Sequence, residues 1–326
     1  MKRDSEGVLR PFDFNTIEQE FPAVRNLHVD ISICKMEAID SSNVTPQRWG
    51  ELAQLIAENY HLYDGFVVLH GTDTMSYTAS AISFMLENIS KPVIFTGSQI
   101  PMGVLRTDGR ENLITAIEIA AAKDSNGYAI VPEVALYFQN KLFRANRTSK
   151  QSAEALSAFS SLNLAPLAEV GVNIKYNHSV IIHPQAYFEP LRISDKLDCN
   201  VVVLKLFPGL SPDMLNAVLN TKGLRGVVLE TFGTGNAPTA DWFIEALRSA
   251  IERGVAIVNI TQCQGGAVAM ELYETGIRLQ NIGVMSGYDM TCEAAVTKLM
   301  WLLGKGLSGK ALEQAMSNPM RGELSR

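Results

Sequence analysis

The first half of the chain alternates short apolar runs with amphipathic segments, a pattern that predicts strands and helices in turn. Residues 45–60 begin with Thr-Pro, which is typical of a helix start, and then repeat apolar side chains such as Trp49, Leu52 and Ile56 at helical spacing. The apolar runs between the amphipathic segments are continuous, as in strands of a parallel sheet that is covered on both faces. The further expected elements are strands at 64–71 and 91–98 and helices at 74–89 and 108–122.

The pattern changes at residues 133–150, where two apolar runs flank Gln139-Asn140-Lys141 and predict a hairpin or an extended irregular loop. Alternation then returns after residue 199. The segments that predict this second set are strands at 200–207, 225–233, 255–263 and 281–287 and helices at 211–220, 239–254 and 291–306. The expected fold class is therefore α/β, with a doubly wound, mostly parallel sheet in the N-terminal domain and a smaller α/β C-terminal domain.

The length and one loosened stretch predict how these domains divide the chain. At roughly 100–200 residues per domain, 326 residues suggest two domains. Mixed polar residues and prolines such as Pro190 interrupt the alternation of strands and helices between about residues 180 and 198. Such a stretch is typical of an interdomain connection. We place the N-terminal domain at 1–184, a linker at 185–198 and the C-terminal domain at 199–326.

Polar side chains gather where the predicted strands end. Thr72-Asp73-Thr74, Thr96-Gly97-Ser98-Gln99 and Thr231–Asn236 each follow a strand, and Asp40-Ser41-Ser42-Asn43 precedes the first helix. Ligands of open α/β sheets bind beyond the carboxyl ends of the strands, so these clusters are candidate binding residues. The same residue types also cap helices and form turns, and that purely structural alternative stays open for each cluster.

Composition narrows the classes of function. The chain is 47% hydrophobic and 19% charged with a net charge of −6, which is typical of a globular protein and argues against binding nucleic acid through phosphates. No apolar run approaches the ~18 residues that a membrane helix needs, and no apolar secretory segment follows the charged N-terminal residues. We therefore expect a cytoplasmic protein that binds neither nucleic acid nor membrane.

Motifs for a cofactor or a metal do not stand out. The segment FGTGNAP has a G-x-G but lacks the rest of a dinucleotide fingerprint. His70 lies beside a polar cluster without a partner at metal-ligand spacing, so a hydrogen-bonded histidine at a strand end is the simpler interpretation. The four cysteines fit reduced thiols. The sequence therefore predicts no metal and no cofactor.

Covalent catalysis by a hydroxyl group is the remaining option. A threonine hydroxyl needs a base, and a lysine serves as one only when its pKa, about 10.4 in the free side chain, is lowered. Lys150 is a candidate base, although an ordinary solvated lysine is the alternative. Hydroxyl, carboxylate and amide groups suit a small substrate with ammonium and carboxylate ends better than a nucleotide.

Several motifs carry a family resemblance. HGTDTM, VIFTGSQIP, DGRENL, FGTGNAP, GYDMTCEA and MRGEL occur in this order over nearly the whole chain. In these motifs the chain resembles the cytosolic, type I L-asparaginases. The resemblance implies a two-domain amidohydrolase that converts L-asparagine to L-aspartate and ammonia without metal or cofactor, as a homodimer or a homotetramer.

The resemblance also implies catalytic roles for three residues. Thr72 and Lys150 would form a proton-transfer pair, while Asp73 would hold the α-ammonium group of the substrate and polarise that pair. The backbone N–H groups of Gly71 and Thr72 would supply an oxyanion hole, because they lie in a turn from strand to helix.

Three more residues are implied to contact the substrate. Ser41 would contact the substrate carboxylate, Ser98 would lie near the side-chain amide, and Asn236 would reach the site from the second domain. Each of these roles is carried over from the matching motif.

One motif of the resembled family, TGGTIG, does not occur in the printed sequence. In that family the first strand ends in this motif, and its second threonine is generally taken as the acylated nucleophile. The segment that resembles residues 1–9 ordinarily follows this motif, so we expect Met1 to match an internal methionine of a longer protein. Asparagine hydrolysis by double displacement on a threonine is the expected function, with little activity from these 326 residues. Two alternatives stay open: an amidase that prefers glutamine or another amide, and a non-catalytic amino-acid-binding protein.

Overall fold

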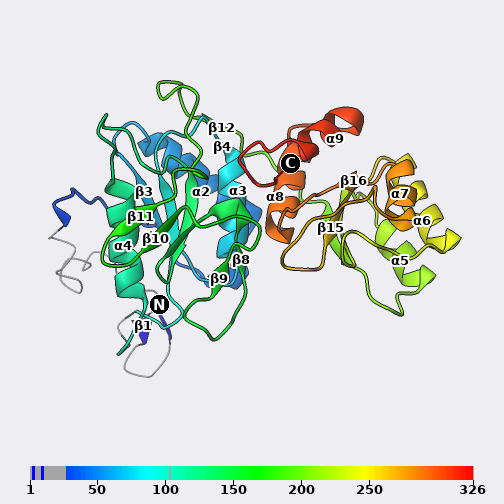
Figure 1. Ribbon diagram of the computed structural model, residues 1–326, viewed down its shortest axis with the longest axis horizontal. Coiled ribbons are helices and arrows are strands. Elements are labelled where there is room, and N and C mark those ends of the chain that lie inside the picture. The colour runs from blue at the N-terminus through cyan, green and yellow to red at the C-terminus, as the bar shows by residue number, and fades with distance from the viewer. Residues whose placement is uncertain (1, 4–8, 11–26, 103, 326) are drawn as a thin grey trace. The chain divides into compact units, whose positions relative to one another are not determined.

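The computed structural model describes residues 2–3, 9–10, 27–102 and 104–325 (Figure 1). The described chain forms two compact units. The first runs to Ser161 and resumes over Ala165–Ile193, and the second comprises Leu162–Leu164 and the residues from Ser194 onward. Within the described ranges, no helix combines the length and the apolar character that a membrane span needs.

The sheet of the first unit has six strands in the order β11-β10-β7-β6-β5-β3. Its parallel part consists of β3 (Phe66–Leu69), β5 (Val93–Thr96) and β6 (Val134–Phe138). Its antiparallel part consists of β7 (Lys141–Arg144), β10 (Ala168–Val170) and β11 (Ile174–Tyr176). The sheet is thus mixed, where the sequence predicted a mostly parallel one.

The hairpin between β6 and β7 explains that difference. Gln139 and Asn140 both have positive φ, at 44° and 68°, which is the backbone geometry of a two-residue turn that matches strand twist. The turn reverses the chain, so β7 pairs antiparallel with β6. The predicted hairpin is confirmed, and it is the point at which parallel pairing ends.

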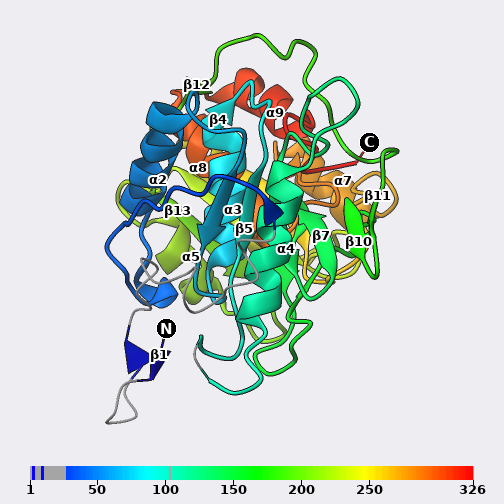
Figure 2. The ribbon, with the colours of Figure 1, turned by 90° about the vertical axis from the view of Figure 1, so that its left-hand side faces the viewer.

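The predicted helices of this unit are α2 (Pro46–Asn59), α3 (Met75–Met85) and α4 (Gly109–Ala121). The helix α3 ends earlier than predicted because β4 (Leu86–Glu87) turns extended and pairs with β12 (Arg192–Ile193). Figure 2 shows the helix α4 in front of the sheet. Its side chains Ala116 and Ile119 share a hydrophobic cluster with Ile94 of β5. The shorter elements are β1 (Lys2–Arg3), β2 (Leu9–Arg10), η3 (Ser41–Asn43), η4 (Ala145–Arg147), β8 (Ser149–Lys150) and β9 (Phe159–Ser160).

The second unit has a parallel sheet in the order β13-β14-β15-β16. Its strands are β13 (Val201–Lys205), β14 (Gly226–Thr231), β15 (Ala256–Thr261) and β16 (Met285–Ser286). Its helices are α5 (Pro212–Leu219), α6 (Asp241–Glu252), α7 (Glu274–Asn281), α8 (Cys292–Gly304) and α9 (Gly309–Ser317). The helices α5, α6 and α7 share one hydrophobic core with the sheet. The predicted strands and α5, α6 and α8 are confirmed.

A buried ion pair fastens the C-terminal segment of this unit to α8. Lys298 and Glu323 are both 0% exposed, and Nζ lies 2.5 Å from Oε1. The ammonium group also donates to the carbonyl oxygens of Met316 and Asn318, at 2.9 and 2.7 Å. The Glu323 carboxylate accepts from the backbone N–H groups of Met320 and Arg321. The hydrogen-bonding capacity of the lysine is therefore fully used.

Candidate active site

The turn between β3 and α3 carries the HGTDT motif at the carboxyl edge of the sheet. The backbone N–H of His70 donates to Thr96 O at 2.9 Å, which continues the β3–β5 pairing for one more residue. Two glycines allow close approach here. A Cβ on Gly97 would lie 2.3 Å from the His70 carbonyl oxygen, and one on Gly71 would lie 2.6 Å from Ser41 Oγ. The loops that contain Ser41, Gly71 and Gly97 therefore approach one another so closely that the two glycine positions leave no room for a side chain.

Lys150 contacts both side chains of this turn that the sequence predicted to be catalytic, Thr72 and Asp73. Its Nζ donates to Thr72 Oγ1 at 2.8 Å and to Asp73 Oδ1 at 2.7 Å. The Lys150 side chain is 19% exposed and that of Asp73 is 65% exposed, so the pair opens to solvent on the carboxylate side. An ammonium group has three donors, and among the described residues none accepts the third. The cluster thus keeps unused capacity for a ligand.

Thr72 contacts Gln99, a residue that was not predicted to belong to the site. Thr72 Oγ1 donates to Gln99 Oε1 at 3.0 Å, while Gln99 Nε2 donates to Ala155 O at 3.2 Å. The Asp108 carboxylate holds the Gln99 loop by accepting its backbone N–H at 3.0 Å. Gln99 belongs to the Thr96–Gln99 cluster, and that position was the available signal. In this arrangement Lys150 is the donor to Thr72, so it must lose a proton before it can act as a base.

The strand that carries Lys150 follows a firmly held segment. Arg144 Nε lies 2.6 Å from Glu133 Oε2, and both side chains are less than a tenth exposed. Thr148 Oγ1 donates back to Arg144 O at 2.7 Å, and the intervening η4 is buried. Breaking the buried Arg144–Glu133 pair would leave an uncompensated charge, so the segment that precedes β8 is held in place. This segment positions Lys150 of β8.

Ser41 lies beside Gly71 and is 5% exposed. Its carbonyl oxygen accepts from Thr74 Oγ1 at 2.7 Å, which ties the loop before α2 to the HGTDT turn. The neighbouring Asp40 caps η3, and its hydrogen bonds from the Ser42 backbone and side chain lower the pKa of that carboxyl. The structure therefore brings Ser41 to the same turn as Thr72 and Asp73.

Ser98 and Asn236, the two remaining predicted contact residues, have other contacts in the structure. The Cβ of Ser98 is 2.9 Å from the position that a Cβ on Gly109 would take, so Ser98 lies against the start of α4. Asn236 lies in the second unit, where its Oδ1 accepts from Thr275 Oγ1 at 2.9 Å. The roles of Ser98 and Asn236 stay predictions.

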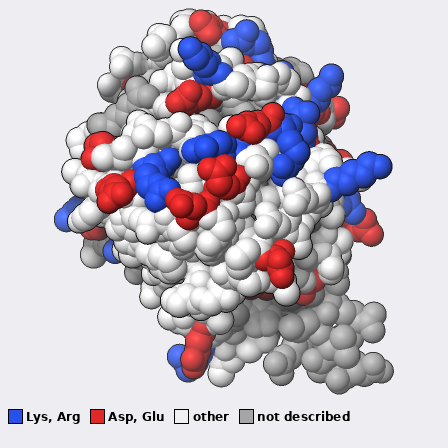
Figure 3. Space-filling model, turned by 90° about the vertical axis from the view of Figure 1, so that its right-hand side faces the viewer, with Lys and Arg blue, Asp and Glu red and all other residues white. Residues whose placement is uncertain are grey.

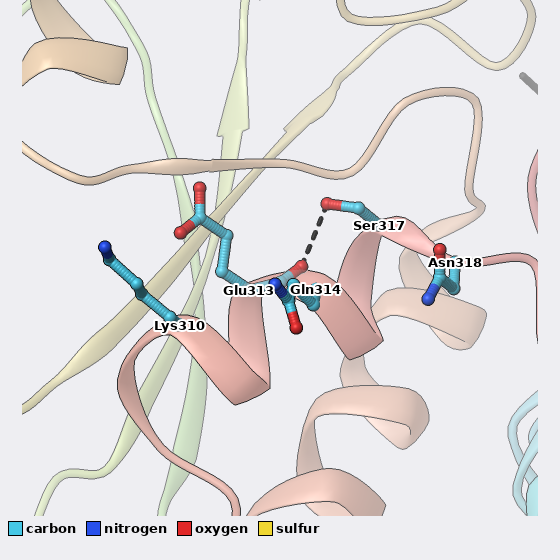
Figure 4. A pocket seen from close by; sticks show the side chains of 5 residues that line it. All are labelled: Lys310, Glu313, Gln314, Ser317 and Asn318. Atoms are coloured by element: carbon cyan, nitrogen blue, oxygen red, sulfur yellow. Dashed lines mark hydrogen bonds between the residues drawn. The ribbon is translucent and has the colours of Figure 1, made fainter.

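Other surfaces offer less to a ligand. Over the part of the chain that the structure describes, no three His, Cys, Asp or Glu side chains gather as a metal site would require. A shallow hollow lies along α9, lined by Lys310, Glu313, Gln314, Ser317 and Asn318 (Figure 4). The visible face in Figure 3 mixes acidic and basic side chains without a basic field. The strand-end cluster around Thr72 is therefore the strongest candidate.

Comparisons with known proteins identify relatives over most of the chain. The sequence profile described as "Asparaginase, N-terminal" matches residues 1–182, and "Glutaminase/Asparaginase C-terminal domain" matches residues 200–316. The chain is 44% identical to L-asparaginase 1 of Escherichia coli over 296 residues, which cover 88% of this chain and 82% of that protein. It is 43% identical over 306 residues to the human 60 kDa lysophospholipase. The matched residues make up 93% of this chain but 52% of that protein, about half its length.

A solved structure is similar as well. The crystal structure of L-asparaginase I from Vibrio cholerae has a TM-score of 0.86 and 39% sequence identity, with 100% of this chain and 95% of that chain covered. The similarity therefore extends over both units of the chain.

Proposed function

Because the chain belongs to the type I L-asparaginase family, we propose that it acts on L-asparagine, with L-aspartate and ammonia as the products. The observation that carries this proposal is the position of Lys150 Nζ within hydrogen-bond distance of both Thr72 Oγ1 and Asp73 Oδ1. Such a pair can deliver and recover a proton, and the exposed carboxylate can bind an ammonium group.

The reaction needs a hydroxyl, a proton acceptor and a donor for the leaving group. Attack on the side-chain amide carbon forms a C–O bond and an oxyanion. The base takes the proton of the attacking hydroxyl and returns it to the amide nitrogen as the C–N bond breaks, so that the nitrogen leaves as NH₃. Water hydrolyses the resulting ester to aspartate. We assign proton transfer to Thr72 and Lys150, and substrate anchoring to Asp73, Ser41 and the N–H groups of Gly71 and Thr72.

The attacking hydroxyl is the part of the proposal that the family motif would supply. TGGTIG does not occur in the printed sequence, so we expect the 326 residues to bind asparagine more readily than they hydrolyse it. Calorimetry and an ammonia assay on the same preparation test this. Ordinary turnover would assign the attack to Thr72 itself, whereas the absence of any asparagine or aspartate binding would overturn the proposal.

The same experiment separates the alternatives. Tighter binding or faster hydrolysis of glutamine than of asparagine would favour an amidase of different preference. Binding without any ammonia release, in a chain that carries the motif as well, would favour an amino-acid-binding protein. We further propose a homodimer or homotetramer located in the cytoplasm. Light scattering on the purified chain tests the assembly, and a monomeric mass would contradict it.

A further inference from the structure

We propose that His70 is a positioning residue that fixes the Gly71–Thr72 peptide for the substrate, an inference that rests on the proposed function. The imidazole is held at both nitrogens. Its Nδ1 lies 2.7 Å from the Gly71 carbonyl oxygen, and its Nε2 lies 2.9 Å from Thr78 Oγ1. The ring cannot turn without breaking two hydrogen bonds, so its geometry is well defined.

The hydrogen bonds that link Trp49, Thr78 and His70 determine which ring nitrogen of His70 carries a proton. The indole Nε1 of Trp49 donates to Thr78 Oγ1 at 3.0 Å. An indole N–H only donates, so the Thr78 hydroxyl accepts from Trp49. Because no other described group accepts the proton of that hydroxyl, the proton is directed to His70 Nε2. A carbonyl oxygen only accepts, so Nδ1 carries the imidazole proton toward Gly71. The relay from Trp49 through Thr78 to His70 therefore requires a neutral ring with its proton on Nδ1.

A charged imidazolium would break this arrangement. With both nitrogens protonated, the Thr78 hydroxyl would face two donors, and its own proton would have no acceptor among the described residues. The ring also lies near the fully buried Phe95, with centroids 6.3 Å apart. Burial lowers the pKa of His70, although the hydrogen bond to Gly71 opposes this effect. Burial of the ring and the directions of its hydrogen bonds both favour the neutral form of His70.

The consequence for the site follows from the planar peptide. The Gly71 carbonyl faces the imidazole, and in a trans peptide the N–H of Thr72 points to the opposite side. Within the described ranges, no group accepts a hydrogen bond from that N–H. His70 thereby determines the direction of a free backbone donor, next to the hydroxyl that Lys150 contacts. This donor is the one we assign to the amide oxygen of the substrate.

The ring state can be tested directly on the wild-type chain. Selective ¹⁵N labelling of histidine and long-range ¹H–¹⁵N correlation spectra at pH 7 distinguish the two tautomers and the charged ring. We expect one of the five histidines to show a protonated Nδ1 and an unprotonated Nε2, and the assigning variant His70→Asn to lose that signal. A proton on Nε2, or a charged ring, would overturn the inference.

Variants test whether the ring acts on Thr72. His70→Leu removes the donor to Gly71, while His70→Asn keeps an amide N–H near the position of Nδ1. We expect His70→Leu to abolish the asparagine-induced shift of the Thr72 amide signal and weaken asparagine binding about 5-fold, and His70→Asn to stay within about 2-fold of wild type. The exposed His61 provides the matched control, His61→Leu, with no change expected.

These outcomes keep the inference distinct from the proposed function. If wild type binds no asparagine in the calorimeter, the proposed function fails, while the tautomer still decides the state of His70. If wild type binds asparagine and His70→Leu leaves both the Thr72 shift and the affinity unchanged, the positioning role is refuted.

Discussion

Two lysine–carboxylate pairs, one in each unit, differ in how completely their hydrogen bonds are satisfied. Lys298 and Glu323 are wholly buried, and Lys298 donates to Glu323 and to two backbone carbonyl oxygens. Lys150 donates to Asp73 and Thr72, and the carboxylate is 65% exposed. We call Lys298–Glu323 the sealed pair and Lys150–Asp73 the open pair. The sealed pair has no donor left for a ligand, whereas the open pair keeps one N–H donor and a carboxylate oxygen available.

The hydrogen bonds of Lys298 are fully used within the fold, whereas those of Lys150 leave one donor without a partner among the described residues. Removing one partner from a sealed pair leaves a buried charge without compensation. Removing one partner from a pair that is open to solvent leaves a group that water can hydrate, so we expect the fold to lose little stability.

The largest expected effect is on the stability of the sealed pair. Lys298→Met leaves Glu323 charged and buried, and we expect the free energy of unfolding to fall by about 3–5 kcal/mol. Urea unfolding of the second unit measures this. The matched double variant Lys298→Met with Glu323→Leu removes both charges and should recover most of the loss. A single variant as stable as wild type would show that the pair does not fasten the C-terminal segment.

Next in size is the effect on ligand binding at the open pair. Asp73→Asn removes the charge that we assign to the substrate ammonium group, and a charge-assisted hydrogen bond is worth about 1.5–3 kcal/mol. We expect the Kd for asparagine to rise about 10- to 100-fold by calorimetry. Asp64→Asn is the control, because Asp64 is an exposed partner of Lys123 at 3.0 Å. Equal losses in both variants would contradict the assignment.

A smaller effect is expected on the stability of the open pair. Lys150→Met leaves the exposed Asp73 to be solvated, so the free energy of unfolding should change by less than about 1 kcal/mol. Urea unfolding under the conditions used for Lys298→Met gives the comparison. A loss as large as that of Lys298→Met would mean that Lys150 is structural and that the contrast between the pairs is wrong.

The smallest effect concerns pH and His70. Its pKa in the folded chain is lowered from the ordinary 6.5, so the unfolded chain binds more protons below that pH. The contribution to stability is present above pH 6.5, declines as the pH falls through that value, and is lost below the lowered pKa. Unfolding of wild type and His70→Asn between pH 7 and pH 5 measures it. Identical pH slopes would contradict the lowered pKa.

Much of this architecture could be predicted from hydrophobic patterning. The elements with strong periodicity, such as α2 and the apolar strands β5 and β14, occur where they were expected. The helices α7 and α9 were missed because each buries only two residues, Gly276 and Leu279 in one case and Leu312 and Met316 in the other. The predicted hairpin already implied one antiparallel pairing, that of β6 with β7. The short antiparallel strands β10 and β11 were not predicted.

The site was predictable in its residue types more than in its contacts. Thr72, Asp73 and Lys150 were chosen from a motif and come together in space. Gln99 was not singled out, because nothing in the sequence distinguishes it from Ser98 as the neighbour of Thr72. The relay through Trp49 and Thr78 joins residues that are 29 positions apart, which only the packing of α2 against α3 reveals.

The most direct test of the central claim is a calorimetric titration of the 326-residue chain with L-asparagine, in parallel with the Asp73→Asn variant. The account predicts saturable binding to wild type and a binding curve displaced to higher concentrations, or lost, in the variant. No saturable binding to wild type, or the same affinity in both proteins, would contradict the claim that Thr72, Asp73 and Lys150 form the substrate site.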